Sequence, residues 1–148
     1  YGMGLAIARF INGYATPDIV DTYKKTFIPS ESFPEPKVAL SMVILCADTE
    51  EKAMRLKKAV DYQFLQIDKR NFEGISDYED IKDYKFSLMD RELLKAHRGK
   101  VIYGTKEQVK KELTELANAF DAEEIIAVAW AASFEDRKRS FELLAEMF

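Results

Sequence analysis

Two side chains in this sequence have chemistry suited to nucleophilic catalysis, the single cysteine Cys46 and the single histidine His97. A catalytic thiol needs a neighbouring base or positive charge that favours its thiolate form. Cys46 lies at the end of an apolar run, whereas His97 lies in the basic segment Lys95–Lys100. We therefore expect Cys46 to be a buried, unreactive thiol. The basic segment could hold an anion, although such clusters more often complement the dipole at a helix end.

The sequence contains no recognisable metal or phosphate motif. One cysteine and one histidine cannot supply the four ligands of a structural zinc site, and one cysteine cannot form an intramolecular disulfide. Gly2-Met3-Gly4 lacks the third glycine of a dinucleotide fingerprint, because Ile7 stands at that position. Gly104-Thr105-Lys106 is not part of a GxxxxGK[ST] phosphate loop, and Thr105 is instead typical of a helix cap.

Trp130 is an aromatic side chain near the end of the apolar run from Ile125 to Ala132. In α/β barrels the chemistry lies at the carboxyl ends of the parallel strands. The indole could flank a ligand ring there, or it could fill the core, and the sequence leaves both interpretations open.

Three apolar runs predict the strands that would position these side chains: Gly4 to Ile11, Val38 to Ala47, and Ile125 to Ala132. Each run is apolar on both alternating faces, a pattern that favours parallel strands covered on both sides. Helix signals follow each run, with side-chain caps expected at Asp48, Thr105 and Ser133. The order of elements therefore predicts an α/β fold.

The stretch from about 68 to 104 departs from this order. It is rich in charged and aromatic residues, contains Gly74, and has one short helix signal from Met89 to His97 but no strong strand. A long insertion in a regular α/β frame is commonly a functional or disordered loop. We expect this excursion to be the most mobile region and to act as a lid.

The composition indicates one soluble globular domain and excludes several partners. The 26 acidic and 22 basic residues are scattered along the helices and give a net charge of −4, so no basic stripe is available for nucleic acid. No apolar run approaches the roughly 18 residues of a membrane-spanning helix. We expect a cytoplasmic protein. Because the chain opens at Tyr1 with neither an initiator Met nor a signal peptide, we expect it to be part of something longer.

Four segments resemble, in order, signatures of the C-terminal portion of the bacterial luciferase-like, flavin-dependent monooxygenases: Gly4–Ile11, Cys46–Ala53, Gly104–Val109 and Arg139–Glu146. That family has a TIM (β/α)8 barrel. The resemblance implies that residues 1–148 form a single partial domain of class α/β, a C-terminal (βα)3 portion with strands 6–8 of the barrel. It also places the lid-like excursion at about 68–104.

The resemblance further implies a function. Such enzymes use reduced flavin, usually FMN supplied by a separate flavin reductase, to activate O2 and oxidise a small organic substrate, and some relatives use a deazaflavin. The family's serine-rich phosphate-binding segment precedes the position of Tyr1, so we expect this chain alone to bind FMN weakly and to lack catalysis. Lys106 replaces a proline that is common in the family.

Residues at the strand ends would line one side of the flavin pocket. Phe10 and Trp130 are the cofactor-binding candidates, and both favour an apolar or aromatic substrate. The resemblance assigns no catalytic role to any individual residue, and no metal ligand is expected. The other strand-end residues are Arg9, Ala47, Asp48 and Ser133.

Two further functions remain open. The chain could be a non-catalytic module that self-associates, or a half-barrel that assembles with a separate chain. The expected edge segments, Leu5 to Phe10 and Ile125 to Trp130, are apolar and contain neither proline nor lysine. Such edges pair readily with other strands, and we therefore expect a homo-oligomer or a complex with a missing N-terminal half.

Overall fold

The computed structural model describes residues 2–71 and 73–147, so Tyr1, Phe72 and Phe148 lie outside the described residues. The elements follow in chain order as β1 (Leu5–Ala8), α1 (Asp18–Thr26), β2 (Val38–Cys46), α2 (Glu50–Asp68), α3 (Tyr78–Ile81), α4 (Leu88–Lys95), β3 (Val101–Gly104), α5 (Lys106–Ala119), β4 (Glu124–Val128) and α6 (Phe134–Ala145).

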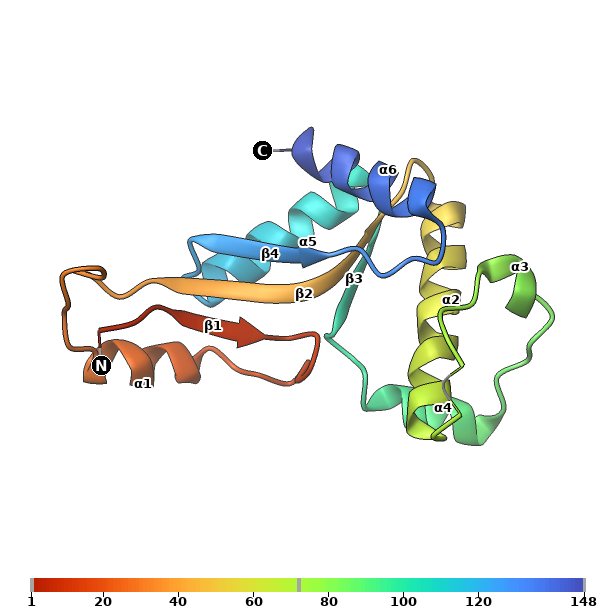
Figure 1. Ribbon diagram of the computed structural model, residues 1–148, viewed down its shortest axis with the longest axis horizontal. Helices are drawn as coiled ribbons and strands as arrows, with labels where there is room; N and C mark the ends of the chain where they lie inside the picture. The colour runs from red at the N-terminus through yellow and green to blue at the C-terminus, as the bar shows by residue number, and fades with distance from the viewer. Residues whose placement is uncertain (1, 72, 148) are drawn as a thin grey trace.

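The long strand β2 organises the sheet, and every other strand pairs with it in parallel (Figure 1). It pairs with β1 over Val38–Ser41, with β3 over Val43–Cys46, and with β4 over Ala39–Val43. Because Val43 pairs with both β3 and β4, these two strands lie on opposite sides of β2. Leu40 pairs with both β1 and β4, so these two strands also lie on opposite sides of β2. β1 and β3 therefore follow one another along the same edge of β2.

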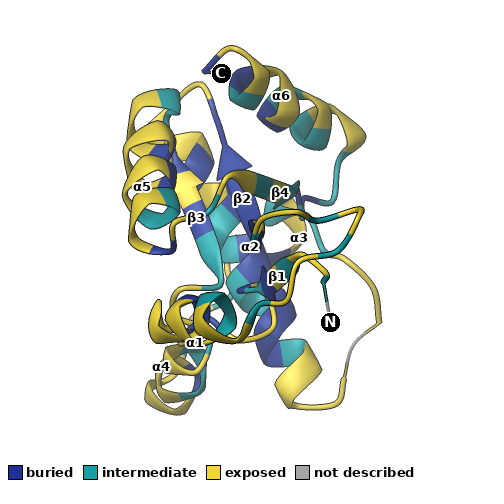
Figure 2. Cartoon of the chain, turned by 90° about the vertical axis from the view of Figure 1, so that its left-hand side faces the viewer, coloured by how far each residue is buried: buried dark blue, intermediate teal, exposed yellow. Residues whose placement is uncertain are grey.

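One face of the sheet is covered by α1, α5 and α6. Leu40, Met42 and Ile44 of β2 point to this side, where they form a core with side chains such as Leu113 of α5 and Leu143 of α6. Figure 2 shows β2 coloured largely as buried between these helices. Alternation along a strand explains why the even-numbered residues share this core.

The opposite face is covered by α2, and only in part. Val43, Leu45 and Ala47 pack against α2 side chains that include Leu56 and Phe64. Val43 and Leu45 belong to the carboxyl-terminal half of β2, and Ala47 directly follows the strand. The amino-terminal half of the same face has no helix over it among the described elements.

Helix starts follow the expected caps in two of three cases. The Ser133 hydroxyl accepts a hydrogen bond from the amide of Asp136, and the Gln108 side chain accepts one from the amide of Thr105. The cap expected at Asp48 is wrong by one residue, because Thr49 accepts the bond at the start of α2. The Asp48 carboxylate instead binds the Arg139 guanidinium at 2.6 Å.

The three predicted strands are confirmed, each somewhat shorter than its apolar run, and the predicted helix from Met89 to His97 is confirmed as α4. The excursion, in which the sequence shows no strong strand, nevertheless ends in the short strand β3. This strand has only four residues, Val101–Gly104, and a sequence pattern of that length does not indicate a strand. Its pairing with β2 stabilises it. A lid-like motion of residues 68–104 stays a prediction.

The expected fold class, a C-terminal (βα)3 portion of a TIM barrel with strands 6–8, is wrong. The described part of the chain is an α/β domain with four parallel strands and six helices. In a barrel the helices form an outer ring around the closed sheet. Here α2 packs on the face opposite α1, α5 and α6, so helices lie on both faces. None of the helices described is long and apolar enough to cross a membrane.

Candidate functional site

The uncovered half of the sheet presents apolar side chains to solvent, and we call it the open face. The strand register places Ala6 and Ala8 of β1, Ser41 of β2, and Ile126 and Val128 of β4 on this side. Ile126 is 44% exposed and Val128 is 40% exposed. Exposed apolar side chains that are contiguous on one surface commonly mark a binding site. The open face is therefore the candidate site.

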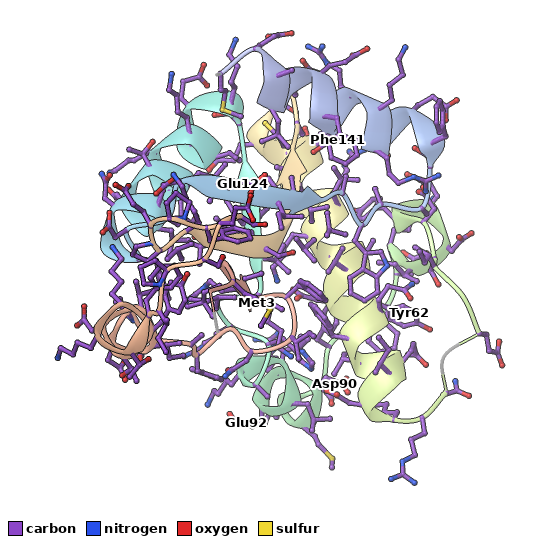
Figure 3. All side chains as sticks on the ribbon, turned by 60° about the vertical axis from the view of Figure 1, so that its left-hand side comes forward. Met3, Tyr62, Asp90, Glu92, Glu124 and Phe141 are labelled. Atoms are coloured by element: carbon purple, nitrogen blue, oxygen red, sulfur yellow. The ribbon has the colours of Figure 1, made fainter. Side chains whose placement is uncertain are left out.

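A hollow of about 790 Å³ occupies the end of the open face near the start of β1. Met3, Phe33 and Glu124 are among the residues that line it, and Figure 3 labels Met3 and Glu124. Lys37 and Glu123, also at this border, form an ion pair that raises the pKa of the Lys37 ammonium. The hollow thus has a largely apolar lining, and its border carries the Lys37–Glu123 ion pair together with the Glu124 carboxylate.

Phe10 and Trp130, the predicted cofactor-binding residues, flank β2 from opposite sides. The amide of Phe10 donates to the Ser41 carbonyl at 3.3 Å, and the Phe10 side chain is 37% exposed. The Trp130 ring is half-buried and meets the Phe64 ring edge-on, with centroids 5.3 Å apart. The strand β2 therefore separates the two residues. Their role in cofactor binding stays a prediction.

Arg9 directly follows β1 and is buried on the face of the sheet that α1, α5 and α6 cover. Its guanidinium donates to the carbonyls of Ala15 at 2.7 Å and Gly13 at 2.8 Å, and it lies 5.2 Å from the centre of the Phe120 ring. Burial lowers the pKa of Arg9. Its Nε atom has no hydrogen-bond partner among the residues described. Arg9 therefore fastens the loop after β1 and faces away from the open face.

The remaining strand-end residues serve the junction of β2, α2 and α6. Ala47 is buried in the core beneath α2, and Ser133 caps α6. The hydrogen bond from Arg139 lowers the pKa of the Asp48 carboxyl. The structure thus gathers Ala47, Asp48 and Ser133 around helix starts, whereas sequence reasoning missed the open-face residues Ile126 and Val128. The alternation of residues along β4 indicates that Ile126 and Val128 share one face of the strand. It does not show that this face lacks a covering helix.

Cys46 and His97 lie on opposite faces of the sheet. The Cys46 side chain belongs to the core under α5 and α6 and is 1% exposed. The His97 ring stacks on Phe64 at a centroid distance of 4.2 Å, and its Nε2 atom lies 2.8 Å from the Asp68 carboxylate. The sheet therefore separates the thiol from the only histidine in the sequence. A Cys–His nucleophilic pair is excluded.

We expect the Cys46 thiol to be unreactive in the folded protein. Burial raises its pKa to about 11. The thiolate fraction at about pH 8 then falls at least about 100-fold below that of an unfolded chain. A thiol-reactive disulfide reagent should label the native protein at least that much more slowly than the protein in concentrated urea. Equal rates, with circular dichroism showing an intact fold, would contradict this assignment.

The raised pKa of Cys46 also determines how the stability of the fold changes with pH. Because the pKa of Cys46 is raised, the native state retains its thiol proton when the unfolded chain loses it. The contribution of Cys46 to stability is therefore complete below about pH 8.5, the unfolded pKa, and is lost as the pH rises from there toward about 11.

Across residues 2–71 and 73–147, no group of three or more His, Cys, Asp or Glu side chains could hold a metal ion. The open face itself carries mainly small and branched apolar side chains, with Ser41 and the single carboxylate of Glu124 among them. Its geometry suits a flat, largely apolar molecule that needs shielding from water.

No family model matches the chain. Among curated proteins it is similar to the uncharacterized proteins YwcH and YceB of Bacillus subtilis (strain 168), with 39% identity over 148 residues and 28% over 147 residues. Both alignments cover 99% of this chain but only 44% of the relative. The chain therefore spans less than half the length of these curated relatives.

Among solved structures, apo-MsnO8 is similar, with a TM-score of 0.88 and 27% identity over 99% of this chain and 45% of MsnO8. The monooxygenase RslO1 from Streptomyces bottropensis has a TM-score of 0.52, 17% identity, and coverage of 100% of this chain and 41% of its own. A type II Baeyer-Villiger monooxygenase from Pseudomonas putida, in complex with FMN, has a TM-score of 0.53, 17% identity, and coverage of 99% and 47%. At 17% identity the latter two show the fold alone.

The expected assignment to the C-terminal portion of the luciferase-like monooxygenases is wrong. The described part of the chain is one α/β domain with a four-stranded sheet, MsnO8 aligns with 99% of the chain, and no family model matches. Two of the four segments behind the assignment are helix starts, at Thr49 and at Thr105. Cap residues recur in many βα units and do not identify a family. The similarity that stands is the coarser one, to the structures of monooxygenases.

Proposed function

We propose that this chain serves a flavin-dependent monooxygenase, in which its open face contributes to the site for the flavin ring and a small organic substrate. The observation that supports the proposal is structural similarity to monooxygenases, one of which contains FMN. When bound, reduced flavin gives two electrons to O2, and one oxygen atom passes to the substrate while the other leaves as water. FMN is the proposed cofactor, supplied in reduced form by a flavin reductase.

The open face fits a flat ring for a physical reason. Ala6 and Ala8 project little from the sheet and leave room for a planar group, while Ile126 and Val128 form a taller wall along β4. Phe10 lies at the end of β1 and Trp130 lies beyond β4, so both flank the far border. These side chains would exclude water from the ring. Strengthened electrostatics and protection from side reactions are the usual consequences of such exclusion.

The face offers little that would bind a phosphate group. Lys37 is the cation at the border of its hollow, and Glu123 already pairs with it. We infer that this surface contacts the ring and the substrate rather than the phosphate of FMN. A deazaflavin has the same planar outline, so the face alone does not distinguish the two cofactors.

A second candidate is a non-catalytic module that self-associates. The outer edge of β4 supports it, because β4 pairs only with β2 in the sheet of the described residues and contains neither proline nor lysine. Ile126 and Val128 stand beside that edge. A second copy, or a separate chain, would cover both the edge and the open face.

One experiment separates the two candidates. The full-length protein is titrated with oxidised FMN and, without oxygen, with reduced FMN, and flavin fluorescence or absorbance reports binding. Saturable binding that slows the reaction of reduced FMN with O2 supports the monooxygenase. Absence of flavin binding, together with a stable dimer in light scattering, supports the self-associating module instead.

A further inference from the structure

A second concave surface lies away from the open face, between α2, α4 and β3. It is a hollow of about 370 Å³, and we call it the basic hollow. Its cationic lining residues are Lys57 of α2, Arg91 and Lys95 of α4, and Arg98 of the loop that follows. Asp61 is the acidic residue in this lining. Its volume is within the range of small-molecule sites.

The concentration of positive charge is unusual for this protein, whose net charge is −4. Arg91 and Lys95 are four residues apart on α4, and like charges at that spacing destabilise a helix. Arg98 lies three residues further on, in the turn after α4, and lines the same hollow. Like charges so placed repel one another, and a neighbouring carboxylate or a bound anion offsets the repulsion.

Two of the four cations are already paired. Lys57 binds Asp61 within α2, and Lys95 binds Glu92 at 2.7 Å within α4. Arg91 and Arg98, in contrast, have neither an ion pair nor a side-chain hydrogen bond to any residue in 2–71 and 73–147. Arginine binds phosphate or carboxylate through two parallel N–H donors. Two such groups are thus available to a ligand.

Neutralisation of the helix dipole explains only part of this arrangement. Lys95 and Arg98 lie at the end of α4, where cations are favourable. Arg91 lies a full turn before that end. The last carbonyls of the helix are also occupied, since the amides of Ala96 and His97 donate to the carbonyls of Leu93 and Leu94. The position of Arg91 therefore needs another explanation.

The hollow also has an apolar part. Leu94, Val101 and Tyr103 belong to its lining, and the Tyr103 side chain is 43% exposed. The Lys57 ammonium lies 5.6 Å from the centre of the Tyr103 ring. A flat group could lie against this ring while its charged end reaches the arginines.

The loop that carries Arg98 is held in place by close packing. A Cβ atom at Gly13 would lie 2.0 Å from the Arg98 carbonyl oxygen, so only glycine allows this approach. Gly99 has a φ of +75°, a left-handed conformation that favours glycine. Arg9, bonded to the Gly13 carbonyl, fixes the other side of the contact. The Arg98 backbone is therefore positioned before a ligand binds.

We propose that the basic hollow binds a small organic anion. Its phosphate or carboxylate group lies between Arg91 and Arg98, and its planar apolar part lies against Tyr103. This site is independent of the proposed flavin function, because it shares no lining residue with the hollow of the open face.

Calorimetric titration of the full-length protein tests the proposal with three probes: phenyl phosphate, benzoate and inorganic phosphate. The double variant Arg91→Gln/Arg98→Gln should weaken binding of the organic probe at least about tenfold, because it loses two charge-assisted contacts. The control Lys25→Gln/Lys111→Gln removes the same charge at exposed positions of α1 and α5, and it should leave binding within about twofold. Circular dichroism establishes that both variants fold.

The probes also identify the chemistry of the ligand. Tighter binding of phenyl phosphate than of benzoate assigns a phosphate group, and the reverse assigns a carboxylate. An equal affinity for phenyl phosphate and inorganic phosphate overturns the role given to Tyr103. Absence of saturable binding by all three probes, or equal affinities of the wild type and the arginine variant, overturns the site.

Discussion

Replacing Leu40 by Ala is expected to lower the free energy of unfolding by about 3–5 kcal/mol. Leu40 has no exposed surface and lies in the amino-terminal half of β2, between its partners Ile7 of β1 and Ile125 of β4. Removal of the methyl groups leaves a cavity. The neighbouring strands β1 and β4 and the helices α1, α5 and α6 hold the surrounding side chains in place, so the cavity cannot close. Urea denaturation followed by circular dichroism measures the loss.

The matched control is Ile126→Ala, on the open face of the neighbouring strand. Ile126 is 44% exposed, so the same kind of truncation should cost less than about 1 kcal/mol. The comparison of the two variants measures how much more a side chain contributes to the free energy of unfolding on the covered face than on the open face. Equal losses would mean that the open face is covered in solution, and light scattering on the same samples would show whether a second copy covers it.

Much of the fold can be predicted from the sequence because its elements carry local signals. The apolar runs locate β1, β2 and β4, and the caps at Thr105 and Ser133 locate two helix starts. β3 is missed because its four residues depend on pairing with β2. The barrel prediction fails for a related reason: local patterns show that α2 has an apolar side but do not show which face of the sheet it covers.

The candidate site is harder to predict than the fold. Phe10 and Trp130 can be placed at strand ends from the sequence, but the open face cannot, since both faces of the strands are apolar and predict burial on both sides. The same limit applies to the basic hollow. The segment Lys95–Lys100 is conspicuous in the sequence, whereas Lys57 and Arg91 join it only through the packing of α2 on α4.

Val128→Glu is expected to reduce the affinity for reduced FMN at least about tenfold, since it places an unpaired carboxylate against the ring. Val128 is 40% exposed on the open face. Ile19 of α1 is also 40% exposed, so Ile19→Glu makes the same change at equal exposure away from that face. This control should alter the affinity by less than about twofold.

The most direct test of the proposed function is therefore a titration of the full-length protein and these two variants with reduced FMN in the absence of oxygen. The account predicts saturable binding by the wild type and by Ile19→Glu, and a severe loss with Val128→Glu. Unchanged binding by a folded Val128→Glu variant, or absence of binding by the wild type, would contradict the assignment of the open face to the flavin.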